Sequence, residues 1–354
     1  MTDETVSIQG LVCPVPLSHN DRIVMRHGSG GRMSHNLINR LFLNAFDNPA
    51  LSASNDAARI QIDSATSLAI STDSHVVAPL FFPGGDIGRL AVCGTVNDIA
   101  MLGAQPLCLT AGFILEEGLE LSVLERVVLS MKAAALEAGV QIIAGDTKVV
   151  QKGKADGLYI NTAGVGSIPP NLDIGGQLAV PGDTVLLSGP IGDHGMAVLS
   201  ARGELGFESD IQSDVAPLNH LVAAMLEAST RIHVLRDPTR GGLATSLNEI
   251  ALQSGIGIII DEESIHVSPS VNAACEMLGF DPLYVANEGK LIAIVAPNDA
   301  DKILAAMRAN PLGKESTIIG RVVEKPAGRV LMKTGLGSTR VVDMLAGEML
   351  PRIC

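Results

Sequence analysis

The sequence predicts an α+β protein built from two domains. First, 354 residues are enough for about two domains. Second, 47% of the residues are hydrophobic and only 18% are charged, so the chain can fill two cores and differs from a disordered one. Third, segments with the two-residue period of strands and segments with helical spacing follow one another in mixed order, not in a regular strand–helix alternation.

The boundary between the two domains is expected near Pro169-Pro170, where a stretch containing Gly and Pro runs on to Asp183. We therefore expect an N-terminal arm at 1–20, a first domain at 21–170, a second domain at 171–334 and a flexible tail at 335–354. A terminal segment of this kind is often mobile unless it docks.

In the first half, the pattern predicts helices at 34–46 and 88–102 and strands at 58–62, 67–72 and 107–115. Ser122 and Glu125 have the spacing of a capping box, so a helix is expected from there to Gly139, where glycine suits a left-handed helix end. Further strands are expected at 140–144, leading into Gly145-Asp146-Thr147-Lys148, and at 158–165. In the second half we expect strands at 184–188, 256–260, 290–296, 316–323 and 328–333, with helices at 194–202, 217–229, 241–254 and 299–309.

Charge and cysteine content restrict the partners. The net charge of −13 argues against nucleic acid or an anionic membrane surface, because both select basic patches. No apolar run approaches the ~18 residues of a membrane helix, and the acidic start is unlike a signal peptide. The five cysteines are odd in number and lack zinc spacing, which fits a reduced, cytoplasmic setting.

Four aspartates stand at predicted strand ends and helix starts: Asp56, Asp73, Asp98 and Asp146. Carboxylates that converge from separate elements suit Mg²⁺ bridging nucleotide phosphates. The alternative is that each aspartate only caps a turn or a helix.

Two glycine-containing loops are candidates for binding phosphate. Backbone N–H groups of His27-Gly28-Ser29-Gly30-Gly31 could hold phosphate at a helix start, although the loop is no Walker A motif and an ordinary loop is the simpler interpretation. The run Asp237-Pro238-Thr239-Arg240-Gly241-Gly242 precedes a predicted helix. It indicates either a phosphate-side loop or an N-cap with tight helix packing.

Three further residues carry reactive groups. Lys148 follows Asp146 closely, and Glu288 lies in a predicted turn between apolar strands beside Lys290; singly, such residues are more often surface charges. Cys354 is the last residue, so its thiol is sterically free, with Arg352 as a nearby cation. The alternative is that a cysteine stands at position 354 by chance and has no function.

Taken together, these residues closely resemble the HypE family of hydrogenase maturation proteins, within the AIR synthetase (PurM-like) superfamily. The resemblance covers nearly the whole chain from about Ile23. It rests on HGSGG at 27–31, STDSHVV at 71–77, FFPGGDIGRLAVCGTVNDIAMLGA at 81–104, GFILEEG at 112–118, AGDTKVV at 144–150, SGPIGDHGMAV at 188–198, DPTRGGLA at 237–244, ANEGK at 286–290 and the terminal PRIC.

The resemblance implies an enzyme that uses ATP to dehydrate a thiocarboxamide on Cys354 to a thiocyanate, the source of the cyanide ligand of [NiFe]-hydrogenases. The carbamoyl group would come from HypF, and the cyanide would pass to an iron-carrying HypC–HypD complex. By the family pattern, Asp73, Asp98 and Asp146 would hold Mg²⁺ and phosphates, and Lys148 and Glu288 would act near the thiocarboxamide. The remaining expected nucleotide-binding residues are His27, Gly28, Gly30, Gly31, Asp56, Asn97 and Thr147.

The resemblance also implies a PurM-like fold with a homodimer in which the N-terminal sheets pair. Two alternatives remain. A superfamily kinase or synthetase would share the aspartates but would not need a terminal cysteine, and the sequence has no N-terminal Cys-Lys site. A thiol carrier without catalytic activity would ferry the group on Cys354 without hydrolysing nucleotide.

Overall fold

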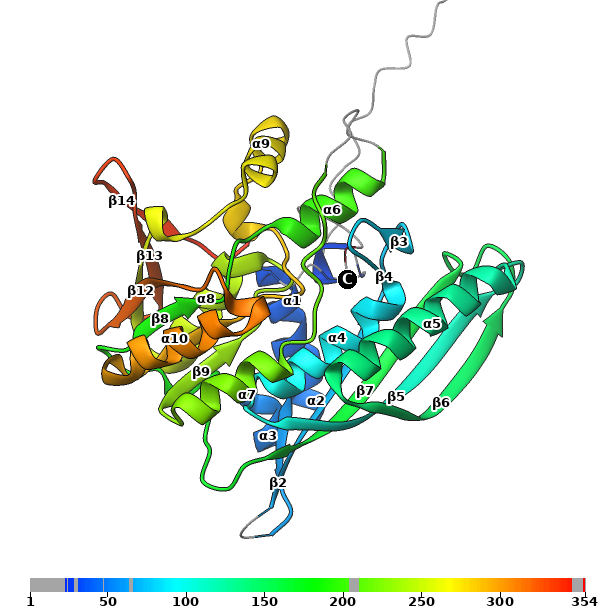
Figure 1. Cartoon of the computed structure of the whole chain (residues 1–354), viewed down its shortest axis with the longest axis horizontal. Helices are drawn as coiled ribbons and strands as arrows, with labels where there is room; N and C mark the ends of the chain where they lie inside the picture. Colours follow the sequence, from blue (N-terminus) through cyan, green and yellow to red (C-terminus); the bar gives the residue numbers. More distant parts are fainter. Residues whose placement is uncertain are drawn as a thin grey trace, which may run out of the picture.

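The first half of the chain forms a five-stranded sheet with the order β1-β2-β7-β5-β6 (Figure 1). The structure is a computed structural model that describes residues 23, 25–28, 31–46, 48–63, 66–203, 210–345 and 353. All neighbouring strands are antiparallel except β5 and β6, which run parallel. The strands are β1 Ala58–Gln61, β2 Ser67–His75, β5 Gln105–Glu116, β6 Gln141–Val150 and β7 Leu158–Ile168.

Two helices lie on one side of this sheet. Helix α4 (Ile87–Ala100) packs on β2 and β7, and α5 (Leu121–Ala138) packs mainly on α4. The close approach of α4 needs glycine on β7, because a Cβ at Gly166 would lie 2.3 Å from the Ile99 side chain. The N-terminal elements are η1 Met25–Gly28, α1 Arg32–Leu37, the π-turn η2 Ile38–Leu43, α2 Asn44–Phe46, α3 Pro49–Ser52, β3 Phe81–Phe82 and β4 Gly85–Asp86.

Among the residues that the structure describes, no helix covers the other side of this sheet (Figure 1). Its edge strand β6 is exposed along almost its whole length, and the exposed fractions reach 62% at Ile143 and 67% at Val149. Exposed β-branched residues on an unpaired edge strand are unusual in an isolated protein, because such an edge can pair with another chain. This half of the molecule therefore has a free surface suited to association.

The second half forms a seven-stranded sheet with the order β14-β13-β10-β12-β8-β11-β9. Helix α8 (Gly242–Ser254) buries Leu243, Leu247 and Ile250 in the same apolar cluster as Ile258 on β10. The other elements are β8 Thr184–Leu187, β9 Ile232–Arg236, β10 Gly257–Asp261, β11 Ile292–Val295, β12 Thr317–Val323, β13 Arg329–Lys333, β14 Thr339–Val342, α6 Asp193–Ala201, α7 Asn219–Ala228, α9 Pro269–Leu278 and α10 Ala300–Ala309. Short 3₁₀ turns are η3 Gly176–Leu178, η4 Glu262–Ser264, η5 Pro282–Tyr284, η6 Pro297–Asp299 and η7 Pro311–Gly313.

The α+β class is confirmed, but some local predictions are wrong. The capping box is absent, because α5 begins after Glu120 and the Ser122 hydroxyl bonds to the Glu120 carboxylate instead of a backbone N–H. Asp73 and Asp146 lie inside β2 and β6 and do not follow them, because pairing with neighbouring strands extends both. The pattern did not predict β9, α9 and β14, the last of which lies in the expected tail.

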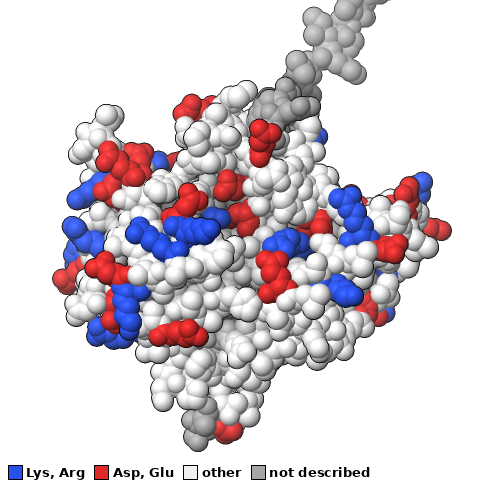
Figure 2. Space-filling model, in the orientation of Figure 1, with Lys and Arg blue, Asp and Glu red and all other residues white. Residues whose placement is uncertain are grey.

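No helix in the described ranges is long and apolar enough to cross a membrane. On the face in Figure 2, acidic and basic side chains are interspersed, with no extended patch of one sign. The expected N-terminal arm at 1–20 lies outside the described residues.

Candidate functional site

A cavity of about 460 Å³ lies where the two halves meet, and a smaller one of about 250 Å³ shares much of its wall. This size falls within the usual range for small-molecule sites. The larger cavity is lined from the first half by Ser34, His35, Ile38, Asn39, Leu43, Leu51, Ser54, Asn55, Asp56, Thr72, Asp73, Gly94 and Asp98. From the second half it is lined by Arg236, Asp237, Thr239, Arg240, Glu249, Gln253 and Glu288.

Arg236, at the end of β9, joins the two halves across this cavity. Its guanidinium donates to Asp56 Oδ1 at 2.8 Å and also contacts Glu249 and the Ser54 carbonyl. The Arg236 and Asp56 side chains are both largely buried. Burial raises the pKa of Asp56 to about 6 even though the positive charge of Arg236 opposes the shift. A buried pair of this kind is costly to break from one side.

Asp98 and Asp237 bring further carboxylates to the same space. Ser71 donates to Asp98 Oδ2 at 2.5 Å. Burial, followed by the negative charges of neighbouring aspartates, raises the pKa of both groups well above the usual range. Asp73 lies beside the buried His75, whose Nε2 is 3.6 Å from its carboxylate. The cavity thus concentrates negative charge that a cation would relieve.

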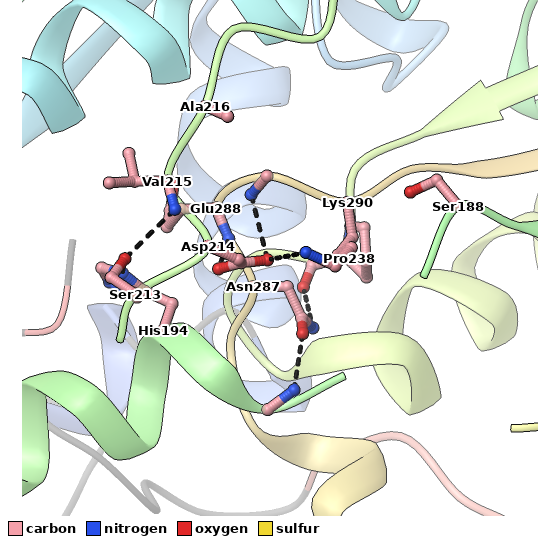
Figure 3. Close-up of polar contacts among 12 residues, drawn as sticks. Ser188, His194, Ser213, Asp214, Val215, Ala216, Pro238, Asn287, Glu288 and Lys290 are labelled. Carbon is pink, nitrogen blue, oxygen red and sulfur yellow. Dashed lines mark hydrogen bonds and ion pairs between the residues drawn. The ribbon is translucent and has the colours of Figure 1, made fainter. Parts of the chain in front are cut away.

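Glu288 lies in the turn before β11 and is only 4% exposed. Asp214 fixes this turn by accepting the backbone N–H groups of Glu288 at 3.1 Å and Gly289 at 3.2 Å, and the Lys290 ammonium at 3.1 Å (Figure 3). Burial would raise the pKa of Asp214, but Lys290 and these hydrogen bonds hold it below the ordinary value.

The Glu288 carboxyl itself has an unmet hydrogen-bonding capacity. Its buried Oε1 has no hydrogen-bond partner among the described residues. Burial, and then the charges of Asp237, Asp73 and Asp214, raise the pKa of Glu288 well above the usual range. A buried, unpaired carboxyl in a cavity is a candidate for proton transfer.

The donor set suits Mg²⁺, which prefers carboxylate, phosphate and water oxygens. In the described part of the chain, no three His, Cys, Asp or Glu residues are grouped so that they could hold a metal by themselves. Mg²⁺ commonly takes one or two carboxylates together with substrate phosphates. Asp73 and Asp98 are the predicted metal ligands that line the cavity.

The two glycine-containing loops meet at the smaller cavity. His27 and Gly28 line it, and Arg240 donates to the Gly28 carbonyl at 3.2 Å. Arg240 belongs to the second loop, so the DPTRGGLA segment forms part of the site. The N-cap of α8 is Gly241 with a left-handed backbone, and no side chain caps it. Gly31 immediately precedes α1, and the predicted Gly30 lies outside the described residues.

The structure does not place Asn97 at the cavity. Its amide is buried in α4, where Nδ2 donates to the carbonyls of Ala216 and Glu288 and Oδ1 accepts the Leu218 N–H at 2.7 Å. Because these contacts occupy the amide, Asn97 ties the two halves together behind the site instead of binding a ligand within it.

Asp146, Thr147 and Lys148 also lie away from the cavity of the same chain. All three are exposed on β6, where Lys148 pairs with Asp146 at 2.7 Å. Two strands, β7 and β5, separate β6 from β2, so at the usual strand spacing Asp146 is about 14 Å across the sheet from β2, the strand that carries Asp73. The roles predicted for these residues therefore require a second protein chain whose cavity they could reach.

Cys354 lies outside the described residues, but Ile353, which precedes it, is described. Ile353 is 6% exposed and belongs to the main apolar core. Its carbonyl accepts a hydrogen bond from His194 Nε2 at 2.6 Å. Ile353 is thus docked on the protein, one residue before the candidate cysteine.

Three residues of the cavity wall were not predicted from the sequence: His35, Arg236 and Glu249. His35 on α1 contacts Glu249 on α8 at 2.7 Å, and Arg236 bonds to the same carboxylate. Arg236 directly precedes the DPTRGGLA segment, which was the available signal. Because strand β9 was not predicted, the burial of Arg236 at its end was not predicted either.

Comparisons with known proteins identify the family. The N-terminal domain of AIR synthase related proteins matches residues 54–168, and the C-terminal domain matches residues 180–333. The carbamoyl dehydratase HypE of Cupriavidus necator is 57% identical over 333 residues, covering 94% of this chain and 95% of that protein.

Two solved structures are similar along most of the chain. A HypE–HypF complex matches with a TM-score of 0.83 and 50% identity, covering 87% of this chain and 99% of that one. HypE in complex with ATP matches with a TM-score of 0.79 and 53% identity, covering 93% of this chain and 98% of that one. The chain therefore belongs to the HypE carbamoyl dehydratase family of AIR synthase related proteins.

Proposed function

We propose that this enzyme uses ATP to dehydrate an S-carbamoyl group on its own Cys354 to a thiocyanate, which supplies cyanide for the iron site of [NiFe]-hydrogenases. The observation that carries the proposal is the hydrogen bond of the Ile353 carbonyl to His194 on α6, the helix that is itself hydrogen-bonded to Ala286 and Asn287 in the turn before Glu288. The names of the relatives and the ATP complex of a similar HypE support the same reaction class.

The chemistry needs one activation and two deprotonations. An amide oxygen is a poor leaving group, so transfer of the terminal phosphoryl group of ATP to it lets it depart within phosphate. The nitrogen loses both protons as the carbon–nitrogen triple bond forms, and ADP and phosphate are released. Glu288 is suited to accept one of these protons, since its carboxyl is buried and unpaired and its pKa is raised.

The acidic cavity would hold the nucleotide and its metal. Mg²⁺ bound there would neutralise phosphate charge, and Asp73 and Asp98 are the carboxylates available to hold it. Asp56 lies on the same wall but is paired with Arg236. His27, Gly28 and Arg240 stand around the smaller cavity, where a polyphosphate could extend. Enclosure there would protect an activated intermediate from water.

We propose a homodimer in which the N-terminal sheets pair through their open faces and β6 edges. Across the sheet, Asp146 stands in register with Gly112 on β5, Asn161 on β7 and Ser74 on β2. Asn161 and Ser74 are exposed. A second copy on this surface would cover the exposed apolar residues of β6. It would also bring Asp146, Thr147 and Lys148 to a partner, where Lys148 can assist the departing oxygen.

We further propose HypF as the source of the carbamoyl group and an iron-carrying HypC–HypD complex as the acceptor of cyanide. The first proposal is supported by the solved HypE–HypF complex, and the second rests on the family resemblance. The domain limits 21–170 and 171–334 also remain a proposal, and the matched family domains lie within them.

Mass spectrometry of the carbamoylated protein tests the proposed reaction. Addition of MgATP should remove one water from the C-terminal peptide and release stoichiometric phosphate. Cys354→Ser, which cannot carry the thiocarboxamide, should show neither. Formation of ADP without free phosphate and without loss of water at Cys354 would favour a kinase-type reaction. No change in either measurement would favour the thiol carrier.

A further inference from the structure

His194 is a buried residue of the SGPIGDHGMAV segment that the chemistry above does not use. It lies in the first turn of α6, with no exposed surface and the edge of the Phe82 ring against it. Its Nε2 contacts the Ile353 carbonyl at 2.6 Å, and its Nδ1 contacts Ser213 Oγ at 2.8 Å. No other described side chain bonds to the Ile353 carbonyl.

The hydrogen-bond partners fix the tautomer of this imidazole. A carbonyl oxygen only accepts, so Nε2 carries the proton and donates it to Ile353. In the neutral ring, Nδ1 then accepts the Ser213 hydroxyl, whose oxygen in turn accepts the Val215 N–H at 3.2 Å. Burial lowers the pKa of His194, which keeps the ring neutral. The imidazole is thus oriented toward the end of the chain.

The same network reaches the turn that presents Glu288 (Figure 3). Ser213 is followed by Asp214, whose carboxylate holds the Glu288 N–H. Helix α6 adds two contacts of its own, because the Gly195 N–H donates to the Ala286 carbonyl at 3.1 Å and the Gly192 N–H donates to Asn287 Oδ1 at 2.7 Å. Consequently His194 and Glu288 are held in one hydrogen-bonded unit.

A second contact is made by Leu345, which like Ile353 belongs to the expected tail at 335–354. The Arg32 N–H, at the start of α1, donates to the Leu345 carbonyl at 3.1 Å. A Cβ at Gly31 would lie 2.4 Å from that carbonyl oxygen, so only glycine leaves room for it. Helix α1 also places Ser34 and His35 in the wall of the larger cavity.

We propose that His194 is a positioning residue that docks Ile353 through its carbonyl, and that Gly31 admits Leu345 beside α1. Because Cys354 follows Ile353 directly, docking at His194 would keep the reactive cysteine close to the hydrogen-bonded unit that contains Glu288. This inference rests on the proposed function. It also assigns Gly31 a role in binding the tail, where the sequence pattern indicated phosphate.

Accessibility of the Cys354 thiol tests the docking without requiring turnover. The rate of alkylation by a maleimide, followed on the C-terminal peptide, should rise about tenfold in His194→Ala, since one buried hydrogen bond is lost. His194→Gln retains an amide N–H donor and should stay near the wild-type rate. Gly31→Ala should raise the rate as well. His220→Ala, which changes a distant histidine on α7, is the matched control.

Single-turnover kinetics then separate positioning from folding. In His194→Ala, MgATP affinity should stay within about twofold of wild type because His194 does not line the cavity, while water loss from the carbamoyl group slows about tenfold. Unchanged alkylation in both His194→Ala and Gly31→Ala would overturn the proposal. So would failure of His194→Gln to restore protection when His194→Ala loses it. If the wild type shows no dehydration, the proposed function fails, but the alkylation comparison still decides the docking role.

Discussion

At the scale of single residues, the site depends on carboxyl groups that burial keeps from ionising easily. Glu288 and Asp98 are buried among other acids, which raises the pKa of each well above the usual range. A raised pKa makes the ionised form of Glu288 a stronger base. The same burial would destabilise the fold if no partner compensated for it, and Arg236 supplies that compensation for Asp56.

Glu288→Gln should abolish the dehydration while preserving the fold. A loss of roughly 10²- to 10⁴-fold is expected for removal of a general base. In the wild type, the rate should rise with pH through the raised pKa of Glu288, because only the ionised carboxyl accepts a proton. The acidic limb should therefore lie above the ordinary glutamate range. Single-turnover rates between acidic and neutral pH measure both effects, and a wild-type rate in Glu288→Gln would contradict the assignment.

Arg236→Ala should destabilise the protein by roughly 3–5 kcal/mol, because it leaves the buried Asp56 carboxylate without its cation. Urea unfolding without nucleotide measures the loss. Arg59→Ala is a matched control, since the Arg59 pair with Asp173 is more exposed and should contribute within about 1 kcal/mol. Equal losses in the two variants would show that burial does not set the difference.

At the scale of elements, α1 connects the cavity to the rest of the molecule. It has only six residues, too few for stability from helix propensity alone. Its position is fixed by the bond from its first N–H to Leu345 and by the contact of His35 with Glu249 on α8. The hydrogen bond to Glu249 raises the pKa of His35 above 6.5, although burial opposes the shift.

Glu249→Gln should lower the pKa of His35, which NMR titration of the imidazole signals can measure. Because the folded-state pKa lies above the unfolded value, the stabilisation from this pair is full below about pH 6.5. It disappears as pH rises through the folded-state pKa. The stability of the wild type relative to Glu249→Gln should decrease across that interval. An unchanged His35 titration would rule out the coupling between α1 and α8.

At the scale of the whole molecule, two sheets meet at the acidic cavity, and the main apolar core contains residues of both halves, such as Ile160 on β7 and Leu186 on β8. Asn97 and Arg236 tie the halves together, and Ile353 docks on His194 of α6. The N-terminal sheet nevertheless remains open on one face. This open face fits the homodimer proposed above, in which a second copy would complete the site.

Ile143→Lys should shift the protein from dimer to monomer, since it places a charge on the exposed apolar edge of β6. Sedimentation velocity measures the change. Leu252→Lys, at a similarly exposed position on α8, should leave the assembly intact. A wild type that sediments only as a monomer at working concentration would refute the homodimer.

Much of the element pattern was predictable because local spacing encodes it. The alternation in 67–72 and the helical spacing in 88–102 gave β2 and α4, and Gly139 ends α5 with a left-handed backbone as expected. Local signals failed for β9, because its hydrogen-bond partner β11 lies far along the chain. They failed for β14 for another reason: it pairs with the neighbouring β13, but it has only four residues and the first three are exposed, so it lacks the apolar alternation of a strand.

The sequence by itself determined the fold class, the family and which acidic residues could serve a nucleotide, because these depend on residue types in contiguous motifs. Only the tertiary structure decided which residues meet. It placed Asp56, Asp73, Asp98 and Glu288 around one cavity and left Asp146 and Lys148 three strands away from β2 on the edge of the sheet. It also committed Asn97 to backbone contacts and joined His194 to Ile353. The physical reason is that burial and hydrogen-bond partners arise from segments brought together by folding, which spacing along the chain does not reveal.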